Sequence, residues 1–498
     1  MMPFLQRYAA PLALVSGALT TLAFAPFNVW LAALVCPAIL FLVSEQLTTK
    51  RTAFVFWLYG LGLFGSGVSW VYVSINTYGG THAALAALMT FLFAAGLAIF
   101  FAMQGWLYAR YFRQSPFRSA GFCGIWLIFE WLRSWLLTGF PWLYLGYGFT
   151  NTPYSQLASI GGVWLLSLIS LCSSMLFIYL FKAKRLQRIY ISLLLTVLAT
   201  SIWWLPNSWT EATGEKQSVD IVQADISQQL KWEKQYLVDF LNVYKKMTLE
   251  QTSADLIIWP ETAIPALFKT AYPHLDTLLN QLEQENRTLV SGIPSVEIDK
   301  NAAAGYRVYN SLAVLTTGVD IYHKQHLVPF GEYMPFEDQL RGLIAFFNLP
   351  MSSFSLPKRA QTALQIKDMQ VAAAICYEIA YPELVRAMSK ETDWLLTVSN
   401  DTWFSHTLAP AQHLQIAQMR AIENGRWLVR STNNGLTAII NHEGKIVAQA
   451  PAYQAAVLRG EIELRSGTTP YQQAGVAPSL LLSGLFLLIA FRRRTKSS

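Results

Sequence analysis

MQVAAAICYEIAYPELVR, residues 369–386, is the stretch from which the organisation of the chain can be worked out. Five of its first seven residues are Val, Ala or Ile, which is typical of a short buried strand, whereas Ile379–Arg386 has helical spacing. Cys376 therefore lies where a strand turns into a helix, and the N–H groups and positive dipole end of a helix favour a thiolate. The position suits a nucleophilic cysteine. A small buried cysteine that packs as a hydrophobic side chain is the alternative.

The composition predicts a membrane protein. Of the 498 residues, 53% are hydrophobic and only 13% are charged, which is too apolar for an ordinary soluble protein of this length. Residues 1–204 have a net charge of +9, residues 205–491 of −6, and the tail from Arg492 of +4. The basic excess thus flanks the apolar segments and the large polar segment is acidic, so no nucleic-acid partner is expected.

Eight apolar stretches approach or reach the length of a membrane span. They are Ala9–Ala25, Val29–Ser44, Ala53–Val73, Ala83–Met103, Gly121–Thr138, Leu157–Phe181, Ile189–Trp204 and Ala474–Phe491. Lys and Arg occur in every second connection and near both termini, which places both termini in the cytoplasm. We expect seven transmembrane helices in residues 1–205, a catalytic domain on the outer side in 206–470, and a C-terminal transmembrane helix with a basic tail in 471–498.

Two charged residues lie inside the fifth apolar stretch. Glu130 and Arg133 are three residues apart, so they share one face of a helix and can neutralise each other. Charges at membrane depth are costly, and the pair either grips a lipid headgroup or is a structural ion pair. The aromatic loop that follows, GFPWLYLGYGFTNTPY, is expected to lie at the membrane interface.

The polar segment alternates short apolar strands with longer helical patterns. Between residues 219 and 465 this alternation predicts a layered α/β domain of roughly 250 residues. We find no Cys or His pairs at zinc-binding spacing and no phosphate-binding glycine loop, so we expect neither a metal nor a cofactor.

Two further stretches of this domain place charged residues in unusual settings. In DLIIWPETAIP, residues 255–265, an apolar strand is stopped by proline and followed at once by Glu261, which suits a general base. In YHKQHLVPFGEY, residues 322–333, Lys324 lies close to Leu, Val, Pro and Phe, which suits a cation that stabilises an oxyanion. A solvated loop acid and a surface lysine are the ordinary alternatives.

Glu, Lys and Cys in this order resemble the nitrilase superfamily, whose members share such a triad on an αββα sandwich. Five sequence motifs and about eight membrane spans resemble the membrane-embedded branch of this superfamily, the apolipoprotein N-acyltransferases, over essentially the whole chain. The motifs are WPETAIP, HLVPFGEYMP, ICYE, SNDTWF and RSTNNG. The resemblance implies that Glu261 is the general base, Lys324 the cation at the transition state and Cys376 the nucleophile.

The resemblance also implies supporting residues. The functional acids of the family match Glu332 and Glu378, its tyrosine beside the nucleophile matches Tyr377, and its tryptophan after the first strand matches Trp232 on short wording alone. Glu332 and Glu378 are alternatively structural hydrogen-bonding groups.

The activity implied by the resemblance is acyl transfer in a bacterial inner membrane. A phospholipid, typically phosphatidylethanolamine, would acylate the cysteine, and the thioester would then acylate the N-terminal amine of the diacylglyceryl-cysteine of an apolipoprotein. We expect a monomer with its catalytic domain on the periplasmic side. Two alternatives remain: a membrane-tethered amidase that hydrolyses small amides, and a catalytically dead lipid-binding protein.

One uncharged segment interrupts the polar domain between the lysine and cysteine stretches. LIAFFNLPMSSFSLP, residues 343–357, is rich in Leu, Ile, Phe and Met, and such a surface is typical of a membrane or binding contact. We interpret it as a mobile lid that guides an acyl chain, with Phe346 and Phe347 as its key residues; a buried core loop is the alternative.

Overall fold

The computed structural model describes residues 6–206, 208–302, 305–335, 337 and 353–491. The lid candidates Phe346 and Phe347 lie outside these residues. The chain forms two compact units, of which the first comprises Met1–Tyr72, Ala84–Ser208 and Gln473–Ser498 and the second Val73–Ala83 and Trp209–Gln472.

The first unit is helical, and each of the eight predicted apolar stretches contains a helix. The helices are α2 (Ala9–Thr20), α3 (Ala32–Ser44), α4 (Thr49–Gly67), α6 (Ala83–Leu107), α7 (Arg118–Arg133), α8 (Ala158–Lys182), α9 (Arg185–Thr200) and α16 (Ala477–Phe491). Among the described residues only three helical segments are long and apolar enough to cross a membrane, or four if α4 and the bent segment after it form one span. The predicted number of eight spans is therefore not confirmed.

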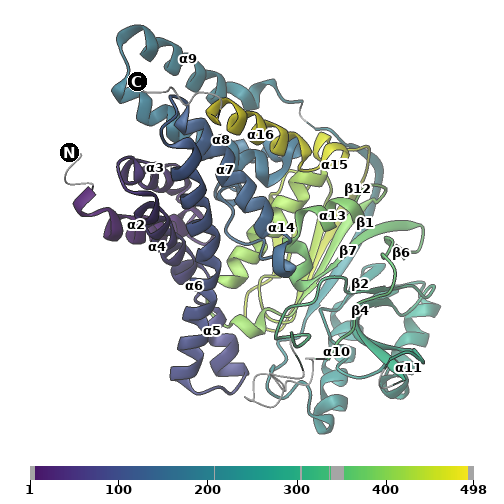
Figure 1. Cartoon of the computed structure of the whole chain (residues 1–498). Coiled ribbons are helices and arrows are strands. Elements are labelled where there is room, and N and C mark those ends of the chain that lie inside the picture. Colours follow the sequence, from purple (N-terminus) through teal and green to yellow (C-terminus); the bar gives the residue numbers. More distant parts are fainter. Residues whose placement is uncertain (1–5, 207, 303–304, 336, 338–352, 492–498) are drawn as a thin grey trace. The chain divides into compact units, whose positions relative to one another are not determined.

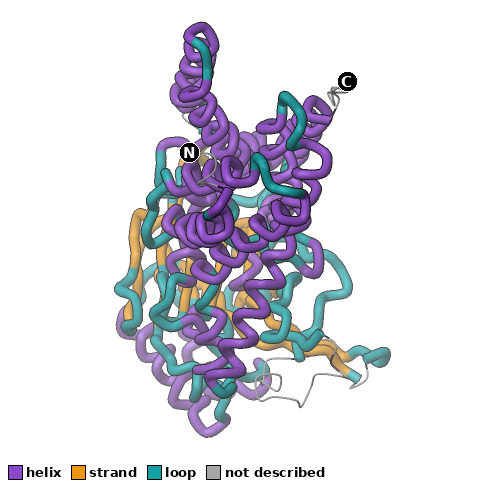
Figure 2. Tube along the Cα trace, turned by 60° about the vertical axis from the view of Figure 1, so that its left-hand side comes forward, coloured by secondary structure: helices purple, strands orange, loops and turns teal. Residues whose placement is uncertain are grey.

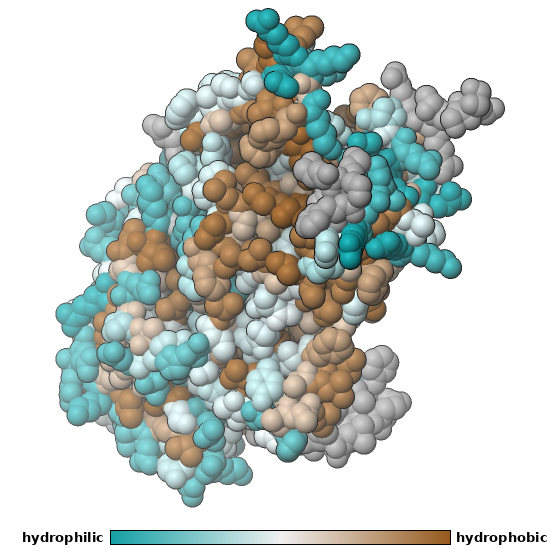
Figure 3. All heavy atoms as spheres, turned by 90° about the vertical axis from the view of Figure 1, so that its left-hand side faces the viewer, coloured by the Kyte–Doolittle hydropathy of each residue, from teal (hydrophilic) through white to brown (hydrophobic). Residues whose placement is uncertain are grey.

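Apolar side chains on the surface of this unit match a lipid environment. Helix α6 exposes large hydrophobic side chains along its length, and α9 has no buried residue at all. The exposed residues of α6 include Leu88, Phe91, Leu92, Ile99 and Met103. Figure 3 shows apolar side chains gathered in a broad band on the face turned to the viewer. Such a surface is unfavourable in water and favourable in hydrocarbon, as expected of a membrane protein.

Glu130 and Arg133 are both buried inside the helical unit. The Glu130 carboxylate accepts hydrogen bonds from the Leu145 N–H at 3.0 Å and from the Trp126 indole at 3.1 Å. Arg133 donates to the carbonyl oxygens of Phe140 and Trp142. The two charges thus fix the aromatic loop, whose residues 141–150 are all buried. These hydrogen bonds fold the loop back into the helical unit, and its position at the membrane interface stays a prediction.

The second unit contains two six-stranded sheets (Figure 1). The first has the order β12-β1-β2-β3-β4-β5 and the second β11-β10-β9-β8-β7-β6. The strands of the first sheet are β1 (Glu211–Gln223), β2 (Leu256–Ile258), β3 (Thr288–Ile298), β4 (Tyr306–Val314), β5 (Ile321–His323) and β12 (Ala456–Ser466). Those of the second are β6 (Leu364–Ile366), β7 (Met369–Ile375), β8 (Trp394–Ser399), β9 (Leu428–Thr432), β10 (Ala438–Ile440) and β11 (Ile446–Gln449).

The two sheets pack face to face between two layers of helices. Alternate apolar residues of both sheets form one buried cluster, in which Val219, Ile258 and Leu312 of the first sheet meet Val371 and Leu396 of the second. Helices α10 (Leu237–Gln251) and α11 (Phe268–Gln284) cover the other face of the first sheet. Helices α13 (Pro382–Met388) and α14 (Ala409–Asn424) contact the second sheet. Figure 2 shows the strands in orange and the helices in purple. The predicted αββα sandwich is confirmed.

The turn after β7 differs from the prediction. We expected a helix directly after Cys376, but residues Cys376–Ala380 form a 3₁₀ turn and α13 begins only at Pro382. Proline at the first helical position explains the start, because its missing N–H and fixed φ are tolerated there. Strands β5, β6 and β12 were not predicted, since two are only three residues long and the third alternates apolar with charged residues.

The sheet topology brings the predicted catalytic segments to one edge of each sheet. Strands β2 and β3 run parallel, and β5 has the same direction because two antiparallel pairings separate it from β3. Strands β7 and β8 are also parallel. Glu261 follows the carboxyl end of β2, Lys324 that of β5, and Cys376 that of β7. Side chains at the carboxyl ends of parallel strands gather at one edge, where α/β proteins commonly bind ligands.

Residues 73–83 belong to the second unit although the chain enters and leaves them through apolar helices. The Ser74 hydroxyl donates to the carbonyl of Trp403 at 2.9 Å, and the Tyr78 ring packs on the Trp403 ring at 5.7 Å between centroids. This short segment therefore supports the turn Asp401–Phe404 that follows β8.

Gly292 in β3 is predicted to be essential for the position of Glu261. A Cβ at residue 292 would lie 2.4 Å from the Thr262 nitrogen and 2.6 Å from the Glu261 Cα, too close for real atoms. We expect Gly292→Ala to destabilise the domain by about 1–3 kcal/mol and to lower activity, because the loop with Glu261 must move. Thermal unfolding and acyl-transfer assays check this.

Gly331→Ala is the matched control, since a Cβ there would meet only Val328 at an ordinary distance of 3.4 Å. Equal stability and activity in Gly292→Ala and the parent would contradict the close approach.

Candidate active site

The carboxylate of Glu261 is buried and held by fixed donors. Its Oε1 accepts a hydrogen bond from the Asn310 side-chain amide at 2.8 Å, and its Oε2 accepts one from the Asn400 backbone N–H at 2.9 Å. Lys231 donates to its backbone carbonyl at 3.1 Å. Both carboxylate oxygens thus have a defined orientation at the edge of the sheets.

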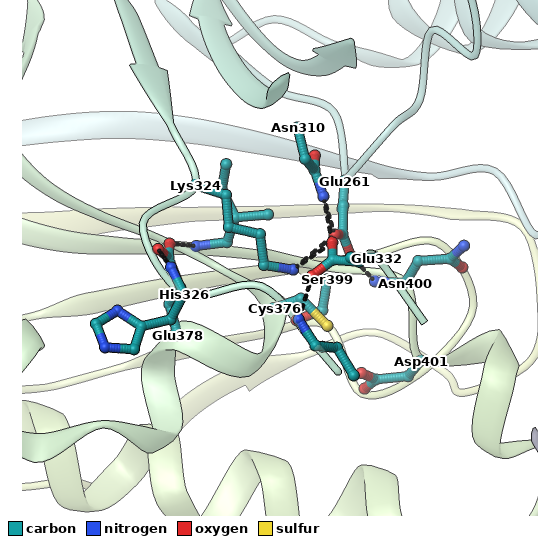
Figure 4. Close-up of polar contacts among 12 residues, drawn as sticks. Glu261, Asn310, Lys324, His326, Glu332, Cys376, Glu378, Ser399, Asn400 and Asp401 are labelled. Carbon is teal, nitrogen blue, oxygen red and sulfur yellow. Dashed lines mark hydrogen bonds and ion pairs between the residues drawn. The ribbon is translucent and has the colours of Figure 1, made fainter. Parts of the chain in front are cut away.

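Lys324 lies between two carboxylates (Figure 4). Its Nζ is 2.7 Å from Glu332 Oε1 and 3.5 Å from Glu261 Oε1, and its side chain is only 1% exposed. Asn310 joins the cluster by donating to both carboxylates at 2.8 Å, while its own backbone carbonyl accepts the N–H of Lys324. Lys324 and the two predicted acids Glu261 and Glu332 are therefore brought together.

The charges in this cluster determine the protonation of Lys324. Burial by itself lowers the pKa of the ammonium, but Glu332 and Glu261 outweigh burial and raise its pKa above the ordinary value. Lys324 is consequently positively charged near neutral pH. Such a charge, removed from water, can stabilise a developing oxyanion strongly.

Cys376 lies beside this cluster at the end of β7, with its thiol on the side of Lys324 and Glu261 (Figure 4). Burial and the Glu261 charge raise the pKa of the thiol well above its usual range, while Lys324 opposes them. The sequence predicted the opposite, a thiolate favoured by a helix N-terminus. That prediction was wrong because the partly buried thiol lies next to a carboxylate and only a short 3₁₀ turn, not an α-helix, begins at this residue. A neutral thiol needs a base, and Glu261 is the adjacent carboxylate.

Glu378 connects the nucleophile turn to the lysine segment. Its carboxylate accepts hydrogen bonds from the N–H groups of Ile375 at 2.7 Å, Gln325 at 2.5 Å and His326 at 3.0 Å, and from the Tyr322 hydroxyl at 3.1 Å. Burial raises its pKa to about 7, although the backbone donors and Lys324 oppose this. Through these contacts Glu378 holds the turn at Cys376 and the segment that follows Lys324 in a fixed position relative to each other.

The remaining predicted residues lie around this centre. Tyr377 is half-buried, and its ring packs edge-on against Tyr381 at 5.2 Å between centroids. Trp232 packs in an apolar cluster with Leu327 and Phe354, and its buried indole N–H has no hydrogen-bond partner among the described residues.

Sequence reasoning missed three residues that orient Glu261. They are Asn310, Lys231 and Asn400, and each had a signal. Asn310 is a polar residue within the buried part of strand β4, Lys231 precedes Trp232 after the first strand, and Asn400 lies within the SNDTWF motif. Burial lowers the pKa of Lys231 to about 8, while the Glu261 charge opposes the effect.

The site consists of organic side chains that could support covalent catalysis. Among the described residues no three His, Cys, Asp or Glu side chains are grouped so that they could hold a metal ion. A thiol, a carboxylate and an ammonium at one sheet edge are instead the parts needed for acyl transfer through a thioester.

Comparison with known proteins assigns both halves of the chain. The family model for the apolipoprotein N-acyltransferase N-terminal domain matches residues 16–176, and that for carbon-nitrogen hydrolase matches residues 218–469. A protein of Pseudomonas aeruginosa named apolipoprotein N-acyltransferase is 44% identical over 97% of this chain and 95% of its own length. A protein of the same name from Vibrio parahaemolyticus is 40% identical, covering 95% of each chain.

Among solved structures, Nit3 of Saccharomyces cerevisiae, described as a member of branch 10 of the nitrilase superfamily, is similar to half of the chain. It has 17% sequence identity and a TM-score of 0.37, and the match covers 50% of this chain and 90% of Nit3. The two family models and the sequence identities over nearly the full length show that the chain belongs to the apolipoprotein N-acyltransferase family.

Proposed function

We propose that the protein transfers an acyl chain from a membrane phospholipid, through a thioester on Cys376, to the N-terminal amine of the diacylglyceryl-cysteine of an apolipoprotein. The observation that supports this most is the buried cluster in which Lys324 lies within 3.5 Å of both Glu261 and Glu332, next to the thiol. Membership in the family supports the choice of substrates.

In the first half-reaction, Glu261 takes the proton of the Cys376 thiol. The sulfur attacks the ester carbonyl of the phospholipid, and Lys324 with the backbone N–H of Tyr377 stabilises the resulting oxyanion. Collapse of the tetrahedral intermediate breaks the ester bond, and the leaving oxygen receives the proton from Glu261. The products are a thioester and a lysophospholipid.

In the second half-reaction, the amine of the apolipoprotein attacks the thioester carbonyl. Glu261 takes a proton from the amine, the same donors stabilise the oxyanion, and the C–S bond breaks. The sulfur regains a proton from Glu261, which returns Cys376 to its neutral state. The product carries an amide-linked third acyl chain.

Both substrates are lipids, which explains the helical unit in physical terms. We propose seven transmembrane helices in residues 1–205, a periplasmic catalytic domain in 206–470, and a last span in 471–498 with a cytoplasmic tail. A multi-pass position in the inner membrane, with both termini in the cytoplasm, is supported by the distribution of Lys and Arg. We also propose that phosphatidylethanolamine is the acyl donor and that the protein is a monomer.

The supporting residues have separate proposed roles. Glu332 fixes Lys324 through the 2.7 Å ion pair, and Glu378 positions the loops on both sides of the site. The free indole N–H of Trp232 is available to a polar group of the donor lipid. Hydrolysis of small amides is a weaker proposal, because relatives with the acyltransferase name match 97% of the chain rather than its catalytic half alone.

Replacing the nucleophile tests the covalent step. Cys376→Ala and Cys376→Ser are both expected to abolish transfer without unfolding the protein, because alanine is nearly isosteric with a buried thiol and a hydroxyl ionises far less readily. Intact-protein mass spectrometry after incubation with phospholipid should show one hydroxylamine-labile acyl group on the parent and none on either variant. Lipoprotein acylation at the parent rate in either variant would refute the assignment.

Replacing the cation tests whether one site performs both half-reactions. Lys324→Met is expected to slow thioester formation by roughly a hundredfold or more, as the loss of other oxyanion donors does. The rate of acyl-enzyme accumulation measures this directly. A variant that forms the thioester normally and fails only with the amine would contradict the role, and one that does not fold would be replaced by Lys324→Gln.

The pKa of Glu378 predicts a pH dependence of stability. Its folded-state pKa of about 7 lies above the ordinary value of 4.5, so the folded protein binds the extra proton between these values. Stability from this group is present below about pH 4.5 and is lost as the pH rises through 7. Unfolding temperatures of the parent should fall over this range, and those of Glu378→Gln should fall less. Parallel curves would show that Glu378 is ionised throughout.

A further inference from the structure

His413 contacts the backbone of Cys376 from helix α14, which packs on the sheet that contains β7. His413 is 1% exposed, and its Nε2 is 3.1 Å from the carbonyl oxygen of Cys376. A carbonyl oxygen can only accept, so Nε2 must bear the hydrogen and donate it. The imidazole therefore does not use this nitrogen as a base.

The other ring nitrogen is fixed by a buried ion pair. Nδ1 lies 3.1 Å from Arg430 Nη2 and 3.2 Å from Asp401 Oδ1, while Arg430 and Asp401 contact each other at 2.5 Å. Burial and the Arg430 charge lower the pKa of His413, although Asp401 opposes them, so the ring is neutral and Nδ1 accepts from Arg430. Asp401 accepts from the same Arg430 nitrogen and so orients that donor instead of bonding to the ring. Asp401 comes from the SNDTWF motif and Arg430 from the RSTNNG motif, and the proposed reaction assigns neither of these two residues a task.

The carbonyl that His413 contacts belongs to a residue with an unfavourable backbone conformation. Cys376 has a φ of 54°, in the left-handed region that residues other than glycine rarely adopt. Residues in such conformations persist only where their surroundings hold them. Glu378 holds the preceding residue through the Ile375 N–H, and His413 holds the carbonyl of Cys376 itself.

We propose that His413 is a positioning residue for the nucleophile, held by Asp401 and Arg430, and that its Nε2–H bond to the Cys376 carbonyl keeps the thiol aimed at the reacting carbonyl of the substrate. This rests on the proposed role of Cys376. The ring acts through the backbone and exchanges no proton with the thiol or the substrate.

A pair of variants separates the hydrogen bond from the space that the ring fills. His413→Met fills the site without a donor, whereas the amide of His413→Gln can reach the Cys376 carbonyl and donate to it. We expect the rate constant of thioester formation to fall roughly ten- to hundredfold in His413→Met, since small misplacements of a reacting group cost that much. The KM for phospholipid should stay within about twofold, and His413→Gln should recover most of the rate.

The control is Gln418→Met on the same helix. Gln418 donates to the carbonyl of Gly444 at 2.8 Å, so its loss removes a comparable buried hydrogen bond away from the nucleophile. It should lower the unfolding temperature without changing thioester formation. If His413→Met does not fold, His413→Asn, whose shorter amide does not reach the carbonyl, takes its place.

Alkylation makes the test independent of the lipid substrate. The rate at which iodoacetamide modifies the peptide containing Cys376 should fall in His413→Met and recover in His413→Gln. A parent that alkylates normally but forms no thioester would refute the proposed function and leave the positioning role intact. Parent-like alkylation and thioester formation in His413→Met, or a His413→Gln variant as slow as His413→Met, would overturn the positioning role.

Discussion

The buried ammonium of Lys324 between two carboxylates is the constraint on which the rest of the site depends. Removing these three charges from water is costly, and the cost is offset only when each charge has close partners. Three hydrogen-bond donors provide such partners for the two carboxylates. The Asn310 amide donates to both Glu261 and Glu332, the Val328 N–H donates to Glu332, and the Asn400 N–H donates to Glu261. These donors come from a strand, a loop and a turn of both sheets. The cluster can therefore form only when the whole sandwich is assembled.

The backbone around Cys376 is specified as closely as the charges. Strand β7 ends at Ile375, the next residue has a left-handed conformation, and a 3₁₀ turn delays the following helix until Pro382. Glu378, within this turn, accepts from the N–H of Ile375, and His413 of α14 donates to the carbonyl of the next residue, Cys376. The nucleophile is thus oriented by the packing of the two sheets and their helices rather than by a helix dipole.

The sequence predicted most of the architecture because the domain follows simple periodicities. Buried runs such as Trp394–Ser399 and Leu428–Thr432 coincide with strands β8 and β9. Glu261 was recognisable because it follows such a run, and Lys324 because Leu, Val, Pro and Phe lie close after it. The short strand before Lys324 was not predicted, since three residues show no periodicity. Asn310 escaped notice because its role depends on register: pairing with Pro294 on β3 places it opposite the loop of Glu261.

The predicted lowering of the thiol pKa of Cys376 was wrong, and the reason lies in the tertiary structure. From sequence, only the local helix could be considered, and it favours a thiolate. In three dimensions burial and Glu261 outweigh Lys324 and keep the proton on sulfur. Local charge counts cannot reveal this, because the carboxylate comes from a strand more than a hundred residues earlier in the chain.

A neutral resting thiol also fits a reaction in two halves that exchange one proton each. In the first half of the proposed reaction the sulfur gives a proton to Glu261 and the leaving oxygen takes it, and in the second half the amine gives a proton that the sulfur receives. A thiolate stable at rest would leave Glu261 without a proton to deliver to the lysophospholipid oxygen. A high thiol pKa slows departure of sulfur from the thioester, and Lys324, whose charge lowers that pKa, counters this at the same atom. The opposed effects of Glu261 and Lys324 on one sulfur thus suit a group that must be nucleophile first and leaving group second.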